Sequence, residues 1–192
     1  MTQLTWYIAR SSGIVGWALL SASVLWGLAL STKALGKRPR PNWLLDLHRF
    51  LGGAAVIFTI IHVASLLVDS YTDISLTNVL VPLTGTWHPV AVAWGVVGMY
   101  LLAAVEVTSL MRRRLSKRVW QRTHYLSFPL FAFSTIHLIT AGTDMGNPVL
   151  RWSLVGVIGA FAILTWVRIE DAGGPAPADR ERIPARKSLE VG

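Results

Sequence analysis

The sequence contains no cysteine. Thiolate zinc sites, iron–sulfur clusters, covalently attached c-type haem and disulfide bonds are therefore excluded. Acidic residues are also scarce, with 10 Asp and Glu against 18 Lys and Arg in 192 residues. Any metal or cofactor must consequently be held by histidine, carboxylate, backbone groups or packing.

Charged residues of either sign are few, at 15% of the chain, whereas 53% of the residues are hydrophobic and the mean hydropathy is +0.49. This composition is typical of a membrane protein, and the length suits one compact helical domain. A net charge of +8 would suggest nucleic acid in a soluble protein. Here the basic residues flank apolar segments, where they orient the chain in lipid, so no nucleic-acid partner is predicted.

Five apolar segments are long enough to cross a bilayer. The first is too long for the apolar core of a signal peptide. We expect the spans at residues 11–32, 43–69, 89–111, 119–143 and 149–167.

Basic residues alternate between the two sides of these spans. Residues 37–41 (KRPRP) and 112–118 are rich in Lys and Arg, whereas residues 70–87 contain neither. Cytoplasmic loops carry the excess of basic residues. The pattern predicts an all-α, integral membrane bundle of five transmembrane helices in the cell membrane, such as a bacterial inner membrane. The N-terminus is outside, the C-terminus is cytoplasmic, and residues 70–87 form an external loop for which a short surface helix is one option.

Four of the five histidines lie inside two of the predicted spans. His48 and His62 are fourteen positions apart, which is ~21 Å along a helix with a difference of only ~40° in direction. His124 and His137, in the fourth span, are thirteen positions apart. The second and fourth spans run in the same direction, so His48 is expected level with His124, and His62 level with His137.

Polar groups inside a bilayer are costly, so paired histidines there indicate function more than hydrogen bonding between helices. Histidines ~20 Å apart cannot share one transition-metal ion. A proton relay would need carboxylates between them, and there are none. Two haems suit the spacing, with His48 and His124 as iron ligands of one and His62 and His137 as iron ligands of the other.

The spacing of the histidines in the fourth span poses a problem of phase. On a straight helix His137 is ~140° away from His124 in direction. Both can face the second span only if the helix is overwound or kinked. Pro129 is placed to cause a kink, because its ring clashes with the carbonyl of Tyr125 and it lacks an N–H.

Two motifs carry a resemblance to a known family. Residues 48–52 (HRFLG) are followed by His62, and residues 120–124 (WQRTH) by His137. This part of the chain, about residues 43–144, resembles the ferric reductase-like transmembrane domain. That family includes ferric reductases, the membrane part of NADPH oxidases and the haem-binding membrane subunit of bacterial methionine sulfoxide reductase. The resemblance implies two b-type haems that carry electrons across the membrane, as the membrane subunit of an oxidoreductase.

The chain is expected to divide into a transmembrane haem-binding domain at residues 1–170 and a disordered cytoplasmic tail at residues 171–192. The tail is too short for the FAD- and nicotinamide-binding region of the oxidases. We therefore expect a separate flavoprotein reductase, carrying FMN or FAD, or membrane quinol as the donor. The acceptor would be an external molecule or an exported reductase. A quinol-linked cytochrome b and a non-redox haem-binding membrane module remain as alternatives.

Several charged residues are secondary candidates. Arg49 and Arg122 each flank a cytoplasmic-side histidine and are expected to pair with haem propionates or to reach lipid phosphates. Arg10 and Arg151 are the external-side cations that would neutralise the propionates of the other haem. Glu106 would pair with a basic residue or mark a quinone or flavin pocket.

Two further positions have a structural and a functional interpretation. Gly52 permits close approach of a haem or of another helix, and small-residue helix packing explains it equally well. His88, beside Pro89, is interpreted as a surface histidine rather than as part of an external acceptor site.

Overall fold

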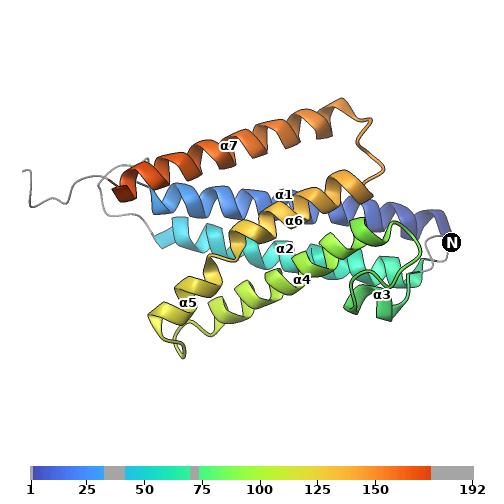
Figure 1. The fold of residues 1–192 in the computed structure, drawn as a ribbon, viewed down its shortest axis with the longest axis horizontal. Helices are drawn as coiled ribbons and strands as arrows, with labels where there is room; N and C mark the ends of the chain where they lie inside the picture. Colours follow the sequence, from blue (N-terminus) through green and yellow to red (C-terminus); the bar gives the residue numbers. More distant parts are fainter. Residues whose placement is uncertain (1, 33–41, 70–73, 174–192) are drawn as a thin grey trace, which may run out of the picture.

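The computed structural model describes residues 2–32, 42–69 and 74–173 (Figure 1). The expected basic turn at residues 37–41, residues 70–73 of the expected external loop and residues 174–192 of the expected disordered tail lie outside the described residues. Residues 171–173, also assigned to that tail, are helical in the structure. Within the described ranges the chain is all-helical, without a strand, as predicted.

The chain forms four long helices from its apolar segments that lack prolines in their interior and clusters of charged residues. Three shorter helices lie between the long ones. In chain order the elements are α1 (Thr2–Ser31), α2 (Asn42–Val68), α3 (Leu76–Leu80), α4 (Pro89–Leu110), α5 (Lys117–His124), α6 (Ser127–Ala141) and α7 (Pro148–Gly173). The helix α3 is capped by the Ser75 side chain. It lies within residues 70–87, where the sequence suggested a short surface helix as one option.

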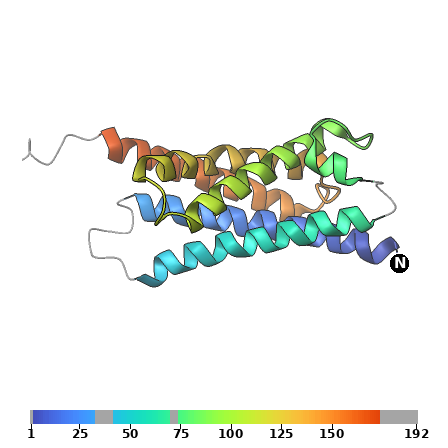
Figure 2. The ribbon, with the colours of Figure 1, turned by 90° about the horizontal axis from the view of Figure 1, so that it is seen from below.

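The long helices lie side by side along one axis (Figures 1 and 2). α1 packs mainly on α2, α4 packs mainly on α6, and α7 lies along α1. The N-terminal end of α1, α3 and the connection between α6 and α7 lie at one end of the bundle. α5 and the C-terminal ends of α1 and α7 lie at the other end. We call these ends the α3 end and the α5 end.

Four helices of the described chain are long and apolar enough to cross a membrane. They are Gln3–Ser31, Asn42–Val68, Pro89–Leu110 and Pro148–Asp171, which match four of the five expected spans. The fifth expected span, residues 119–143, is divided between α5 and α6. The 15 residues of α6 rise ~22 Å, less than the ~30 Å of a hydrocarbon core. The chain is therefore a multi-pass membrane protein, and the count of five spans is part of the proposal below.

The break between α5 and α6 lies where the sequence predicted a kink. The N–H of Leu126 donates to the carbonyl of Thr123 at 3.0 Å, and that of Phe128 to the carbonyl of Tyr125 at 3.2 Å. Both are bonds to the third preceding residue, which form a tighter turn than an α-helix. Pro129 has no N–H to offer the carbonyl of Tyr125, so Phe128 satisfies that carbonyl instead. The predicted interruption of the helix between His124 and His137 is confirmed.

The apolar core lies midway along the bundle. Ala55 of α2 is fully buried, halfway in sequence between His48 and His62. Around it pack Leu20, Val24, Leu28, Leu102, Leu130 and Phe131. Nearer the α3 end, the buried indole of Trp17 donates a hydrogen bond to the hydroxyl of Thr135 at 3.1 Å, which ties α1 to α6. The core thus separates two levels of the bundle, and a pair of histidines lies at each.

Candidate functional site

The four intramembrane histidines meet in the two predicted pairs. The ring centroids of His48 and His124 are 6.0 Å apart, and those of His62 and His137 are 6.3 Å apart. In both pairs the ring planes are inclined by 77°. The first pair lies towards the α5 end and the second towards the α3 end. The predicted pairing, which followed from the shared direction of the second and fourth spans, agrees with these contacts.

These separations fit one metal ion between each pair of imidazoles. A metal–nitrogen bond of about 2 Å and ~1.2 Å from ring nitrogen to ring centroid place two axial imidazoles ~6.4 Å apart between centroids. The observed values of 6.0 and 6.3 Å lie close to this length. The described residues contain no group of three or more His, Asp or Glu that could hold a metal ion on their own. The two imidazoles of each pair would fit a metal whose remaining ligands come from a cofactor, as in haem.

Three of these histidines are oriented by backbone carbonyls. The Nδ1 of His62 lies 2.7 Å from the carbonyl oxygen of Ala9, that of His137 lies 2.8 Å from Ala91, and that of His48 lies 3.0 Å from Ser23. A carbonyl oxygen only accepts, so each Nδ1 carries the hydrogen. Nε2 is then the nitrogen with a free lone pair, which is the form that binds a metal.

His124 is held differently. Its ring stacks on Trp120 of the same helix, with 5.2 Å between ring centroids and 21° between planes. Its Nδ1 is buried and has no hydrogen-bond partner among the described residues. The guanidinium of Arg112 lies 4.5 Å from the centre of the Trp120 ring. An exposed arginine, an indole and a candidate ligand therefore form one stack at the α5 end.

Sequence reasoning missed the glycines behind the histidines. A Cβ added to Gly13 would lie 2.8 Å from His62, one on Gly27 would lie 3.0 Å from His48, and one on Gly95 would lie 2.8 Å from His137. One sequence signal was present, because Gly13 and Gly27 have the same spacing in the chain as His48 and His62.

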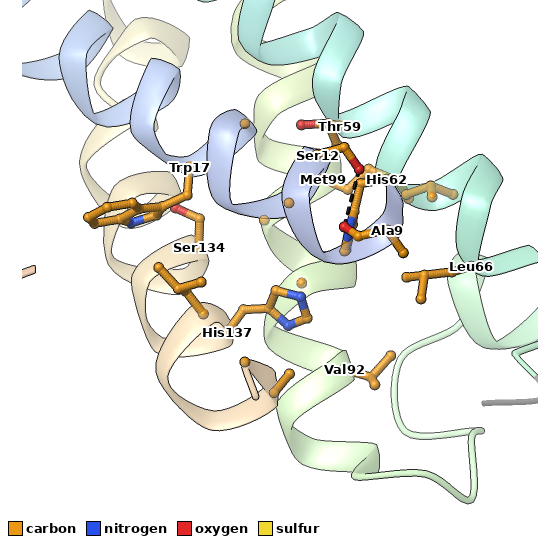
Figure 3. Close-up of a pocket in the computed structure, with 18 of the residues that line it drawn as sticks. Ala9, Ser12, Trp17, Thr59, His62, Leu66, Val92, Met99, Ser134 and His137 are labelled. Atoms are coloured by element: carbon orange, nitrogen blue, oxygen red, sulfur yellow. Dashed lines mark hydrogen bonds between the residues drawn. The ribbon is translucent and has the colours of Figure 1, made fainter. Parts of the chain in front are cut away.

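A cavity of about 200 Å³ surrounds the pair at the α3 end, and Figure 3 shows His62 and His137 both facing it. Its lining is mostly apolar and comes from α1, α2, α4 and α6. Arg10 and Asp144 also line it, and they form an ion pair through both Nε and a terminal nitrogen of the arginine. Arg10 was expected near the propionates of the haem on this side. It does line the cavity around His62 and His137, but its guanidinium is paired with the carboxylate of Asp144.

The remaining candidates lie away from the histidines or have other contacts. Arg49 is exposed and pairs with Asp46 at 3.2 Å. Arg122 and Arg151 are exposed, on α5 and α7. His88 is also exposed, and its ring packs edge-on against Trp87 at 4.7 Å, as expected of a surface histidine.

Glu106 of α4 lies against α2 at Gly52, one turn after His48. A Cβ on Gly52 would lie 2.5 Å from its Oε1. Among the described residues no ion pair to Glu106 is formed, so the expected basic partner is not present there. Gly52 therefore admits the side chain of Glu106, in addition to the close helix approach that the sequence suggested.

Comparison with known proteins identifies one family. A family model described as "ferric reductase like transmembrane component" matches residues 12–135, which is about two thirds of the chain. The matched region contains His48, His62 and His124, and His137 lies just beyond its end. No curated protein and no solved structure matches the chain.

Proposed function

The chain belongs to the ferric reductase-like transmembrane component family, and on that premise we propose that it carries electrons across a membrane through two b-type haems. His48 and His124 ligate one haem, and His62 and His137 ligate the other. The observation that supports this most is the separation of the two ring pairs, 6.0 and 6.3 Å, at two levels of one bundle.

The side chains of this protein would prepare the ligands rather than perform chemistry. Hydrogen bonds from Nδ1 to the carbonyls of Ala9, Ser23 and Ala91 hold three imidazoles with Nε2 unprotonated. The bound haem supplies the one-electron chemistry. With two histidines holding each haem, its iron would have no position left for a substrate, so the protein would relay electrons to a partner.

The proposed orientation has five crossings, with α5 and α6 together forming the fourth. The α5 end would be cytoplasmic because Arg112, Arg113, Arg114, Lys117 and Arg118 lie there. The α3 end would then face outward, and the pair His62/His137 would be the outer pair. The proposed location is the cell membrane of a bacterium, and the expected cytoplasmic tail at residues 171–192 belongs to this proposal.

Electrons would enter at the basic α5 end. A separate flavoprotein reductase with FMN or FAD and an acidic docking face fits this charge, since opposite charges steer association. Membrane quinol is the second candidate donor, which would make the protein a quinol-linked cytochrome b. Glu106, which lies against Gly52 one turn after His48, would then belong to the quinol site. The outer acceptor would be a small external molecule or an exported reductase.

The experiment is haem quantification followed by reduction with defined donors. A pyridine haemochrome assay on pure protein should give about two haems b per chain. Anaerobic addition of NADPH with a flavoprotein reductase, or of a quinol, should then reduce the haem, and the rate with the flavoprotein should fall as salt rises. About one haem per chain would contradict the two-haem arrangement. Two haems that no donor reduces would favour a non-redox haem-binding module.

A further inference from the structure

Three of the four histidines contact a neighbouring helix in the same way. Gly13 faces His62, Gly27 faces His48, and Gly95 faces His137, each against the Nδ1–Cε1 edge of the imidazole. A side chain at any of these glycines would approach that edge to 3.0 Å or less. The contact therefore recurs on two different helices, α1 and α4, and at both levels of the bundle.

The carbonyl that binds each histidine lies four residues before the glycine. Ala9 precedes Gly13, Ser23 precedes Gly27, and Ala91 precedes Gly95 by this distance. In an α-helix the carbonyl of residue i−4 points to the N–H of residue i, and the Cβ of residue i leans back over that turn. Glycine removes this Cβ, so the carbonyl is open to a second donor from a neighbouring helix.

We propose that Gly13, Gly27 and Gly95 are positioning residues that open these carbonyls to the haem ligands, and that the two haems consequently differ in reduction potential. The inference rests on the proposed function. The haem at His62/His137 has two carbonyl-bonded imidazoles, whereas the haem at His48/His124 has one. The first haem has the lower potential.

The direction follows from the hydrogen bond. An imidazole that donates its Nδ1 hydrogen becomes a more basic ligand, and second-shell hydrogen bonding of this kind tunes haem potential. A more basic ligand stabilises the oxidised iron more than the reduced iron, so the potential falls.

The sequence of α4 explains why His124 lacks a carbonyl partner. The glycines of α4 are Gly95 and Gly98, both towards the α3 end. His124 precedes His137 by thirteen residues, and thirteen residues after Gly95, nearly four turns along the antiparallel α4, the chain has Thr108 followed by Ser109. The hydroxyl of Thr108 donates to the carbonyl of Ala104, four residues earlier, at 2.7 Å. At this level of α4, a side chain of the helix itself bonds the carbonyl that a glycine would leave open.

Gly95→Ala and Gly156→Ala form a test and control pair for the proposal. The Cβ at position 95 would lie 2.8 Å from His137, whereas at Gly156, an exposed position of α7, it would meet nothing within 4 Å. Alanine is the better helix former at both positions, so a general effect on helix stability would be similar in the two variants. Potentiometric titration of the two-haem protein should show that Gly95→Ala raises the potential of one haem.

The expected size is about a tenfold change in the ratio of reduced to oxidised haem, or ~59 mV for a one-electron couple, with a changed low-spin electron paramagnetic resonance signal. If the clash is too large for binding, that haem alone is lost. Gly156→Ala should leave both haems unchanged. Equal effects of the two variants, or no effect of Gly95→Ala, would overturn the proposal.

The glycines of α1 extend the test to both haems. Gly13→Ala should act on the same haem as Gly95→Ala, and Gly27→Ala on the other. Gly156→Ala is again the control. If Gly13→Ala and Gly95→Ala altered different haems, the assignment of the carbonyls would be wrong.

Nuclear magnetic resonance of haem-free protein separates this inference from the proposed function. Imidazole ¹⁵N spectra should show the Nδ1–H form for His48, His62 and His137, with loss of that form for His137 in Gly95→Ala. These spectra do not depend on haem content. Wild-type protein without two haems would refute the proposed function, whereas mixed tautomers at all four histidines would refute the positioning role.

Discussion

The two histidine pairs have the same separation but different supports. At His62/His137 both imidazoles donate to carbonyls and both lie against a glycine, and the ion pair of Arg10 and Asp144 lines the cavity around them. At His48/His124 only His48 has this support, and His124 stacks on Trp120 instead. The difference originates in the helices that carry the ligands.

Continuous helices give the regular support. α1 and α2 are both unbroken, so two glycines of α1 face two histidines of α2 at matching spacing, one at each level. The second partner of each pair comes from a segment that breaks after His124. His124 therefore depends on the short helix α5 for its direction, and its contacts are side chains of that helix and its neighbours. The pair at the α5 end is predicted to be the more easily altered of the two.

The largest expected effect is the loss of one haem when one histidine is removed. His62→Ala and His137→Ala should each lower the haem content from two to about one, and the double variant should lose no more. His48→Ala and His124→Ala should do the same for the other haem. The pyridine haemochrome assay with potentiometry measures this. If His62→Ala and His124→Ala removed the same haem, the pairing would be wrong.

The comparison between the two levels also shows what the sequence could predict. Histidine spacing and the alternation of basic residues predicted both pairs, and Pro129 predicted the break, because these depend on local geometry and helix direction. The contact of Arg10 with Asp144 was missed because the two residues are far apart in sequence and meet through a loop whose path the sequence does not determine. The missing carbonyl partner of His124 follows from Thr108 at the position where a glycine would open a carbonyl of α4. It was not predicted, because the register of α4 against α5 cannot be read from periodicity. The glycine contacts of α1 were detectable in the sequence, because Gly13 and Gly27 have the same spacing as His48 and His62. The contact of Gly95 in α4 had no such signal.

Pro129→Ala is the next largest expected effect. Pro129 lies in the first turn of α6, where proline is tolerated because the first N–H groups of a helix have no partner within it. Alanine would supply an N–H at position 129 that can bond the Tyr125 carbonyl, which should join α5 to α6 and straighten the segment. On a straight helix, His124 and His137 differ by ~140° in direction because they are thirteen residues apart. If His137 keeps facing α2, a straighter helix therefore turns His124 away from His48. The haem at His48/His124 should be lost or shifted in potential, whereas the other haem stays. Equal disturbance of both haems would contradict the local role of the break.

Trp120→Leu should have a smaller effect at the same pair. Stacked aromatic pairs contribute about 0.5–1.5 kcal/mol, and here the stack replaces a carbonyl as the support of His124. We expect the haem at His48/His124 to dissociate faster to apomyoglobin, with the other haem unchanged. Trp152→Leu is the control, because Trp152 is an exposed tryptophan on α7. A similar loss of haem in the control would assign the effect to general destabilisation.

The smallest expected effect concerns the ion pair at the α3 end. Asp144→Asn removes the charge that Arg10 binds, and the side chains of Arg10 and Asp144 are 31% and 27% exposed. Ion pairs that retain contact with solvent contribute about 0.2–1 kcal/mol, so thermal unfolding in detergent should shift down slightly. The matched control is Asp46→Asn, because Arg49 and Asp46 are 62% and 66% exposed and should contribute close to nothing. The ion pair joins α1 to the connection between α6 and α7 beside the cavity, so its loss should also speed haem release from His62/His137 but not from His48/His124. Faster release from both pairs would mean that Arg10 and Asp144 stabilise the whole bundle rather than the cavity at the α3 end.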